Sequence, residues 1–118
     1  MPKRTYTCHN GPSHGWMKVP TEDVVDLGAH DFLSVFSFLS PNGKYVWVEE
    51  DGDCVKFLNN AKSKGWDITV NDKYIEDESR IRNYPSFSKE YIVDKFIPWL
   101  ERKRGKAPQQ AMEFIFHD

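Results

Sequence analysis

The sequence lacks a long apolar run and has few cysteines. No stretch approaches the about 18 apolar residues that a membrane-spanning helix needs, and polar residues follow positions 1–4 where a signal peptide would have an apolar core. Cys8 and Cys54 are the two cysteines, and they lie far apart in the chain. Without a secretion signal, such cysteines are expected to be free thiols. We therefore expect no membrane contact and a cytoplasmic location.

Local signatures of catalysis are also missing. The chain has no Walker loop, no Rossmann glycine pattern, no nucleophile elbow and no zinc-protease histidine pair. Cys8, His9 and His14 lie close together, but a structural zinc site needs a second pair of ligands. Cys54 falls on the apolar face of an expected helix, where cysteine acts as a small hydrophobe. The sequence thus predicts no catalytic residue, metal ligand or cofactor, and it leaves enzymatic activity open but unsupported.

What the sequence does contain is enough apolar material for one folded domain. At 118 residues, of which 14% are aromatic, the chain has the length of a single domain with a real core. We assign residues 1–118 to one domain and expect residues 1–13 to be loosely held. Strands and helices alternate without regular βαβ repetition. This indicates an α+β domain, in which about two to three helices pack on a small antiparallel sheet of about four to five strands.

The densest apolar segment predicts a hairpin followed by a helix. Residues 32–39 are apolar on both alternating faces, which indicates a strand covered on both sides. Pro41, Asn42 and Gly43 suit a type I turn, and residues 44–50 alternate as the returning strand. The helix that follows carries its apolar residues at Cys54, Phe57, Leu58 and Ala61 and ends at Gly65.

The remaining elements follow from weaker patterns. We expect a short edge strand near Tyr6, strands over residues 14–20 and 66–75, a short helix over 21–28, a loop over 77–87, a helix over 88–105 and a final strand over 107–118. Pro98 lies inside the apolar stripe of the long helix and removes one backbone hydrogen bond. A kink or a new helical turn is therefore expected there.

Four carboxylates lie between the hairpin and its helix. We call Glu49, Glu50, Asp51 and Asp53 the acidic corner. Asp51 or Asp53 can accept hydrogen bonds from the free N–H groups of the first helical turn, which would make the corner a helix cap. A divalent-metal site is a second interpretation, although Val55 and Phe57 cannot supply the later ligands of a calcium loop. A third interpretation is a surface that meets a basic partner.

The C-terminal half is locally basic. The candidate nucleic-acid contacts are Arg80, Arg82, Arg102, Lys103 and Arg104, with Tyr84, Phe87 and Tyr91 interleaved. Cations with aromatic side chains between them suit single-stranded nucleic acid. Carboxylates such as Glu90 and Asp94 occur in the same region, so a solvated helix face is the alternative. The net charge of −2 argues against binding driven by overall charge.

Short motifs carry a resemblance to a known domain. They are HGWMKVP from His14, then Ser34 with Ser37 and Phe38, then YVWVEEDGD from Tyr45 with Phe57 and Leu58 after it. In these segments the chain resembles a domain of unknown function found in proteins encoded by phages, plasmids and bacteria, except that Gly52 stands where such proteins more often have Cys. The resemblance covers about the first half of the chain. It implies a mobile element, whose small proteins often bind and redirect a host protein, as anti-defence inhibitors and host-takeover factors do.

These observations together predict a small phage-type protein that binds and modulates a host macromolecule in the bacterial cytoplasm. The expected partner is a host protein that handles nucleic acid, and the oligomeric state is open. The residues assigned to partner binding are Glu49, Glu50, Asp51, Asp53, His14 and Trp16. A nucleic-acid-binding module that uses the basic C-terminal half is the first alternative. A small metal-dependent hydrolase built on the acidic corner and His14 is the second.

Overall fold

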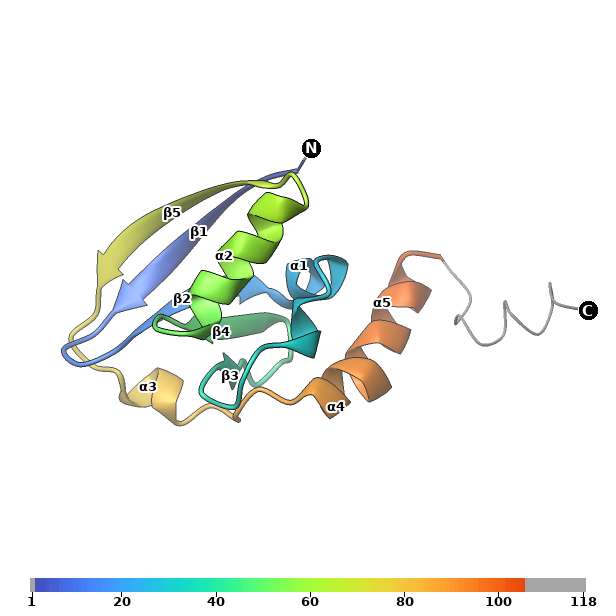
Figure 1. Cartoon of the computed structure of the whole chain (residues 1–118). Helices are drawn as coiled ribbons and strands as arrows, with labels where there is room; N and C mark the ends of the chain where they lie inside the picture. The colour runs from blue at the N-terminus through green and yellow to red at the C-terminus, as the bar shows by residue number, and fades with distance from the viewer. Residues whose placement is uncertain (1, 106–118) are drawn as a thin grey trace, which may run out of the picture. The chain divides into compact units, whose positions relative to one another are not determined.

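The computed structural model describes residues 2–105, which fall into two compact units (Figure 1). The first unit ends at Ser88 and the second begins at Lys89. The final strand expected over residues 107–118 lies outside the described residues. No helix in the described part of the chain is long and apolar enough to cross a membrane.

The first unit is built on a mixed sheet of five strands in the order β3-β4-β2-β1-β5. The strands are β1 (Lys3–Asn10), β2 (Gly15–Pro20), β3 (Phe38–Leu39), β4 (Tyr45–Glu49) and β5 (Asp67–Tyr74). Neighbours pair antiparallel except β1 and β5, which are parallel. The α+β class is confirmed. The expectation of an antiparallel sheet is wrong for one pair of strands. Helix α2 (Asp53–Ser63) is the crossover connection between β4 and β5, and it lets β5 pair with β1 in the parallel direction.

Strand β1 lies inside the sheet, although the sequence predicted a loose start with a short edge strand. Tyr6 and Cys8 alternate along it and are buried, and Tyr6 packs edge-on against Phe57 of α2 with ring centroids 5.9 Å apart. The Tyr6 hydroxyl also donates a 2.8 Å hydrogen bond to the buried carboxylate of Asp23. The strand near Tyr6 was expected, but its full length was not, because its buried positions hold a tyrosine and a cysteine instead of aliphatic residues.

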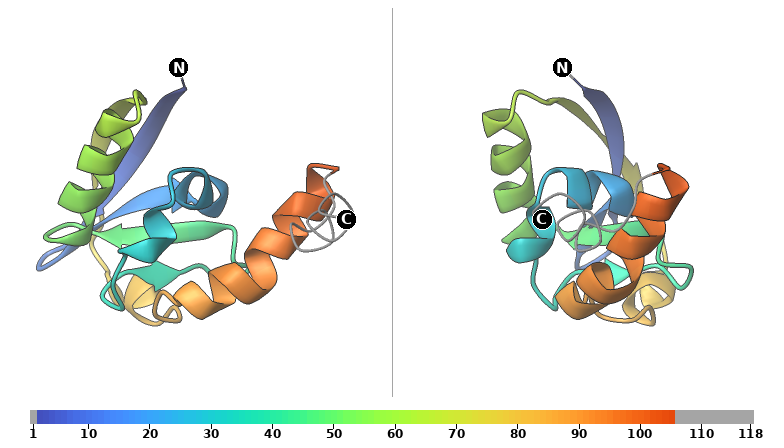
Figure 2. Two further views of the ribbon diagram at one scale, coloured as in Figure 1. Left: turned by 45° about the vertical axis from the view of Figure 1, so that its right-hand side comes forward. Right: turned by 90° about the vertical axis from the view of Figure 1, so that its right-hand side faces the viewer.

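Helices α1 (Thr21–Asp26) and α2 cover one face of the sheet, which we call the helix face (Figures 1 and 2). A short 3-10 turn, Ala29–Asp31, follows α1. The core under these helices contains side chains that are at most 1% exposed, namely Met17, Val19, Val24, Leu27, Val46, Val48 and Phe57. Each such side chain contributes about 1.5–3 kcal/mol by leaving water, so this face carries the main core of the unit. Gly65, with φ of 81°, follows α2 as expected.

The β3–β4 hairpin forms as predicted, but its first strand is much shorter than expected. Only Phe38–Leu39 pairs with β4. Residues 32–37 leave the sheet, and Val35 and Phe36 are 65% and 72% exposed instead of covered. The cause is the buried carboxylate of Asp53, which holds this segment by hydrogen bonds away from strand geometry.

The segment predicted as a loop over residues 77–87 contains a short helix, α3 (Ser79–Arg82). Its residue Ile81 is buried against Trp16 and Trp47, on the sheet face opposite to α2. We call this opposite face the second face. The sequence did not reveal α3 because four residues are too few to show a helical period.

The second unit is helical over its described residues. Helix α4 (Lys89–Tyr91), a π-helical turn (Ile92–Phe96) and α5 (Ile97–Lys103) follow one another without a break. Pro98 has no N–H to donate to the preceding turn, and the widened π turn ends two residues before it, where α5 begins at Ile97. The disturbance expected at Pro98 is therefore confirmed.

Candidate functional site

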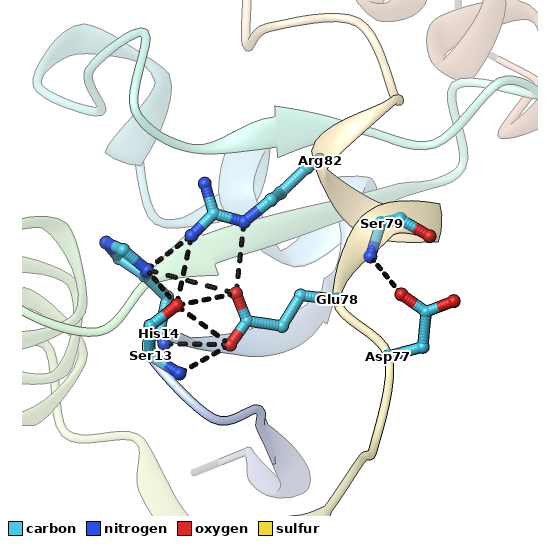
Figure 3. A network of polar contacts seen from close by, with 6 residues as sticks. All are labelled: Ser13, His14, Asp77, Glu78, Ser79 and Arg82. Carbon is cyan, nitrogen blue, oxygen red and sulfur yellow. Dashed lines mark hydrogen bonds and ion pairs between the residues drawn. The ribbon is translucent and has the colours of Figure 1, made fainter.

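Glu78 joins the turn between β1 and β2 to the start of α3 (Figure 3). Its carboxylate accepts hydrogen bonds from the backbone N–H of Ser13 at 2.7 Å and from that of His14 at 3.0 Å. Arg82 donates to the same carboxylate from Nε at 3.0 Å and also contacts Nδ1 of His14. We call Ser13, His14, Glu78 and Arg82 the turn clamp.

Glycines at both ends of this turn allow two carboxylates to approach the backbone. A Cβ at Gly11 would lie 2.2 Å from Cγ of Glu78, and one at Gly15 would lie 2.6 Å from a carboxylate oxygen of Glu50. Both distances are far shorter than van der Waals contact, so a side chain at either position would displace a carboxylate. The restriction is stronger at Gly11, because hydrogen bonds hold Glu78 in place, whereas Glu50 is exposed and its side chain can move.

Hydrogen bonds keep Glu78 ionised. The N–H of Ser13 is the main cause that lowers the pKa of Glu78, to about 2, with further lowering by the N–H of His14 and by Arg82. Partial burial acts in the opposite direction but does not prevail. The turn clamp is thus a permanent structural connection at neutral pH, and Glu78 is not poised to transfer a proton.

Two of the four carboxylates of the acidic corner are used inside the protein. Glu49 accepts hydrogen bonds of 2.9–3.1 Å from the backbone N–H groups of residues 51–53, so it caps α2. Asp53, which is 3% exposed, accepts hydrogen bonds from the N–H and hydroxyl of Ser34 and from the hydroxyl of Ser37. The capping role that the sequence assigned to Asp51 or Asp53 therefore belongs to Glu49.

The other two carboxylates, Glu50 and Asp51, are exposed. The N–H of Glu50 donates a 3.1 Å hydrogen bond to the carbonyl of Gly15, which ties the corner to β2. The charge that a partner can reach is consequently smaller than the run of four acidic residues suggests.

A groove of about 400 Å³ lies beside the turn clamp. We call it the His14 groove, and it is lined by His14, Trp16, Val35, Phe36, Phe38, Glu49, Asp51, Arg82 and Ser86. Four of the six residues assigned to partner binding meet in this lining: His14, Trp16, Glu49 and Asp51. Glu50 and Asp53 do not belong to it. The apolar pair Val35 and Phe36, which sequence reasoning placed in a covered strand, completes the groove.

Two of the basic residues assigned to nucleic-acid binding, Arg80 and Arg82, lie in the first unit, and the other three lie in the second unit. Arg80 lines a hollow on the second face. Arg82 belongs to the turn clamp, with its guanidinium carbon 5.7 Å from the centroid of the Trp16 ring. Arg102, Lys103 and Arg104 lie at the end of α5 in the second unit. Within the first unit, Arg80 and Arg82 therefore line different hollows.

Three other residues surround Arg80 on the second face: His9, Lys18 and Lys73. Sequence reasoning did not select them. A clue was present, because each occupies the strand position that alternation assigns to the second face. The alternation alone does not show that these residues lie together, because that requires the strand register, which places His9 opposite Lys73.

Comparison with protein-family models, curated proteins and solved structures gives no match. The motif residues must therefore be understood from their own contacts. His14 is held by Glu78, Trp16 packs on Trp47 and Glu49 caps α2. A Cβ at Gly52 would lie 3.8 Å from its nearest neighbour, an oxygen of Glu49, so the packing there accommodates a cysteine.

The cysteines are not activated for catalysis. Burial is the main cause that raises the pKa of Cys54 to about 11, and burial also raises the pKa of Cys8. Both are therefore protonated thiols at neutral pH. Within residues 2–105, no three histidine, cysteine or acidic side chains are grouped as metal ligands. The described residues form several hollows, among them the His14 groove and the hollow beside Arg80 on the second face.

Proposed function

We propose that this protein binds and modulates a host protein through the His14 groove, with Phe36 as the main apolar contact. The observation that carries the proposal is the 72% exposure of Phe36 in a loop that is fixed on both sides. Asp53 binds Ser34 and Ser37, which flank Val35 and Phe36, and the N–H of Phe36 donates to the Ser34 hydroxyl at 3.2 Å. An apolar side chain that is both exposed and already ordered loses little entropy on binding.

The chemistry of the groove indicates the kind of partner. Trp16 and Phe38 supply apolar surface, and the carboxylates of Glu49 and Asp51 lie beside it. This combination suits a protein segment with an apolar residue next to a lysine or arginine. The carboxylates orient the partner and speed its association more than they add affinity.

The resemblance to a domain of phage and plasmid proteins supports a bacterial host protein as the partner and the cytoplasm as the place of action. Proteins that handle nucleic acid carry basic surfaces, which match the exposed charge of Glu50 and Asp51. We accordingly propose a host protein of that kind as the target.

The test begins with capture of a partner by the full-length tagged protein from bacterial lysate, with and without nuclease, followed by titration of the purified partner. Phe36→Ala should weaken binding by about tenfold or more, as expected for an interface anchor. Asp51→Lys should slow association and reduce its dependence on salt. Tyr74→Ala is the matched control, because Tyr74 is also an exposed aromatic, at 66%, and lies outside the groove.

Two outcomes contradict the proposal. One is equal partner affinity of the wild type and Phe36→Ala, with circular dichroism confirming that both are folded. The other is loss of every captured protein on nuclease treatment, which would assign the interaction to nucleic acid.

A further inference from the structure

The second face of the sheet gathers cations in a chain whose net charge is −2. Lysine residues reach this face from two strands, since Lys73 of β5 lies opposite His9 of β1, and Lys18 of β2 lies opposite Trp47 of β4. Arg80 joins them from α3. None of these cationic side chains lines the His14 groove, so the cationic part of the second face is distinct from that groove.

Two neighbouring hollows of about 340 and 400 Å³ lie on this face and share His9, Lys18 and Lys73. The first hollow is completed by Trp47, Ile75, Asp77, Arg80, Ile81 and Tyr84, and the second by Thr5, Tyr6, Thr7, Pro20 and Tyr45. Because they share lining residues, the two hollows form one continuous surface, which we call the basic face. Strand β1 rises about 3.3 Å per residue, so the span from Thr5 to His9 is about 13 Å and has room for a short oligonucleotide.

The cations of the basic face are not neutralised by the described residues. Within residues 2–105, Lys18, Lys73 and Arg80 form no salt bridge. Asp77 is the carboxylate in the lining, and it already accepts a 2.8 Å hydrogen bond from the N–H of Ser79. With three cations and one carboxylate in the lining, the surface carries an excess of positive charge, which favours an anionic ligand.

Aromatic rings lie between these cations. Nζ of Lys18 lies 4.2 Å from the ring centroid of Tyr45 and 5.5 Å from a ring of Trp47. The rings of Trp47 and Tyr84 are 6.1 Å apart. Nε1 of Trp47 is a buried donor without a partner among the described residues. Rings interleaved with cations suit a ligand that carries both anionic groups and flat apolar rings.

We propose that the basic face binds single-stranded nucleic acid, with phosphates on Lys18, Lys73 and Arg80 and bases against Tyr45 and Tyr84. A single strand is favoured over a duplex because stacking on side chains needs unpaired bases, which a duplex keeps inside. This function goes beyond the proposed protein partner and uses different residues.

The first test measures charge. The full-length protein is titrated with a fluorescein-labelled oligothymidylate of about ten nucleotides, and fluorescence anisotropy is recorded at several salt concentrations. Affinity should fall with salt, and Lys73→Gln and Arg80→Gln should each reduce the slope of log K against log salt by about 0.7. Lys56→Gln is the matched control, because Lys56 is an exposed lysine of α2 on the helix face. It should change neither affinity nor slope.

The second test measures stacking. Tyr45→Ser should weaken binding of the oligonucleotide by about 5- to 150-fold while leaving the salt slope unchanged. Tyr74→Ser, an exposed tyrosine of β5 outside both hollows, should bind as the wild type does. Phe36→Ala should also bind normally, so a failed protein interaction and a failed nucleic-acid interaction are distinguishable.

Three results would overturn the proposal. They are no binding of the oligonucleotide at low salt, an equal loss of affinity in Lys73→Gln and Lys56→Gln, and equal affinity for duplex DNA of the same length. Binding of anionic lipid vesicles in place of the oligonucleotide would likewise contradict it and would assign the basic face to a membrane surface.

Discussion

The His14 groove and the basic face lie in the same unit, but charged side chains are paired within the protein at the groove and form no salt bridge with any described residue on the basic face. In and beside the groove, Glu78 is paired with Arg82, and Glu49 caps a helix. On the basic face, Lys18 and Lys73 form no salt bridge with any residue between positions 2 and 105. Density of charge in the sequence is therefore a poor guide to charge that a partner can reach.

This difference separates the kinds of binding that the two surfaces support. Paired and hydrogen-bonded charges hold the loops of the groove, and what they display outward is the apolar pair Val35 and Phe36. Unpaired cations attract an anionic ligand directly. Glu49 and Asp53 of the acidic corner thus act as supports, whereas the cations on three elements of the second face form no salt bridge with any described residue. The following predictions test whether the residues that hold the loops in place are different from the residues that contact a partner.

The largest effect is expected from Asp53→Ala. Removing the buried carboxylate leaves Ser34 and Ser37 without their acceptor, and hydrogen bonds to charged groups contribute about 1.5–3 kcal/mol each before screening. The free energy of unfolding should fall by about 2–4 kcal/mol in chemical denaturation. Partner binding at the groove should also weaken, because Phe36 is no longer held.

The control for that prediction is Asp51→Ala, which removes an exposed carboxylate and should cost less than about 0.5 kcal/mol. Oligonucleotide binding should be the same in both variants. Equal stabilities of Asp53→Ala and Asp51→Ala would show that the hydrogen bonds of Ser34 and Ser37 to Asp53 do not stabilise the fold.

A smaller loss is expected from Gly11→Ala. The new Cβ would lie 2.2 Å from Cγ of Glu78, so either the turn or the glutamate must move. Overpacking of this kind costs about 1–3 kcal/mol, to be measured by thermal or chemical unfolding. Gly52→Ala is the matched control, because its Cβ has no neighbour closer than 3.8 Å. Equal stabilities of the two variants would contradict the close approach in the turn clamp.

Much of the fold was predictable because its elements have local causes. The hairpin turn at Gly43, the helix ending before Gly65 and the strand through Trp16 and Met17 were all placed from short patterns. The parallel pairing of β1 with β5 was not predictable, because nothing local states which strands meet. The strand near Tyr6 was expected, but its length and its place inside the sheet were not, since the partners that bury Tyr6 lie in distant segments.

The sequence predicted several of the residues that meet at the candidate site, but it did not predict which of them are exposed to a partner. His14, Trp16, Glu49 and Asp51 do meet in one groove, as their assignment to one surface implied. What the sequence could not show is which carboxylates turn inward. Asp53 is buried because it accepts hydrogen bonds from Ser34 and Ser37, which lie 19 and 16 positions earlier in the chain. That same contact places Phe36 in solvent, contrary to its apolar surroundings in the sequence.

Glu78→Gln tests whether the turn clamp depends on charge. The folded-state pKa of Glu78, about 2, lies below the about 4.3 of an unfolded glutamate, so its contribution is present above pH 4.3 and is lost as the pH falls toward 2. The melting temperature of Glu78→Gln should therefore be below that of the wild type at pH 7, and the two should converge near pH 2. The exposed Glu76→Gln is the control and should follow the wild type throughout. A constant difference at all pH values would mean that the clamp acts by shape alone.

The smallest effect concerns His9, which reports the potential of the basic face. Burial is the main cause that lowers the pKa of His9, and Lys73 and Lys18 lower it further, while the carbonyl of Thr7 acts in the opposite direction. Since the folded pKa is the lower one, neutral His9 stabilises the fold above about pH 6.5, and this contribution is lost as the pH falls from that value through the folded-state pKa.

An NMR titration of the His9 imidazole separates burial from charge. The pKa should lie below the ordinary value of about 6.5 in the wild type and should rise in Lys73→Gln without reaching that value, because burial persists. Bound oligothymidylate should raise it as well, since phosphates offset the same cations that Lys73→Gln removes. A pKa unchanged by both Lys73→Gln and the oligonucleotide would mean that the lysines do not act on His9. The contrast with the internally paired charges of the groove would then lose its basis.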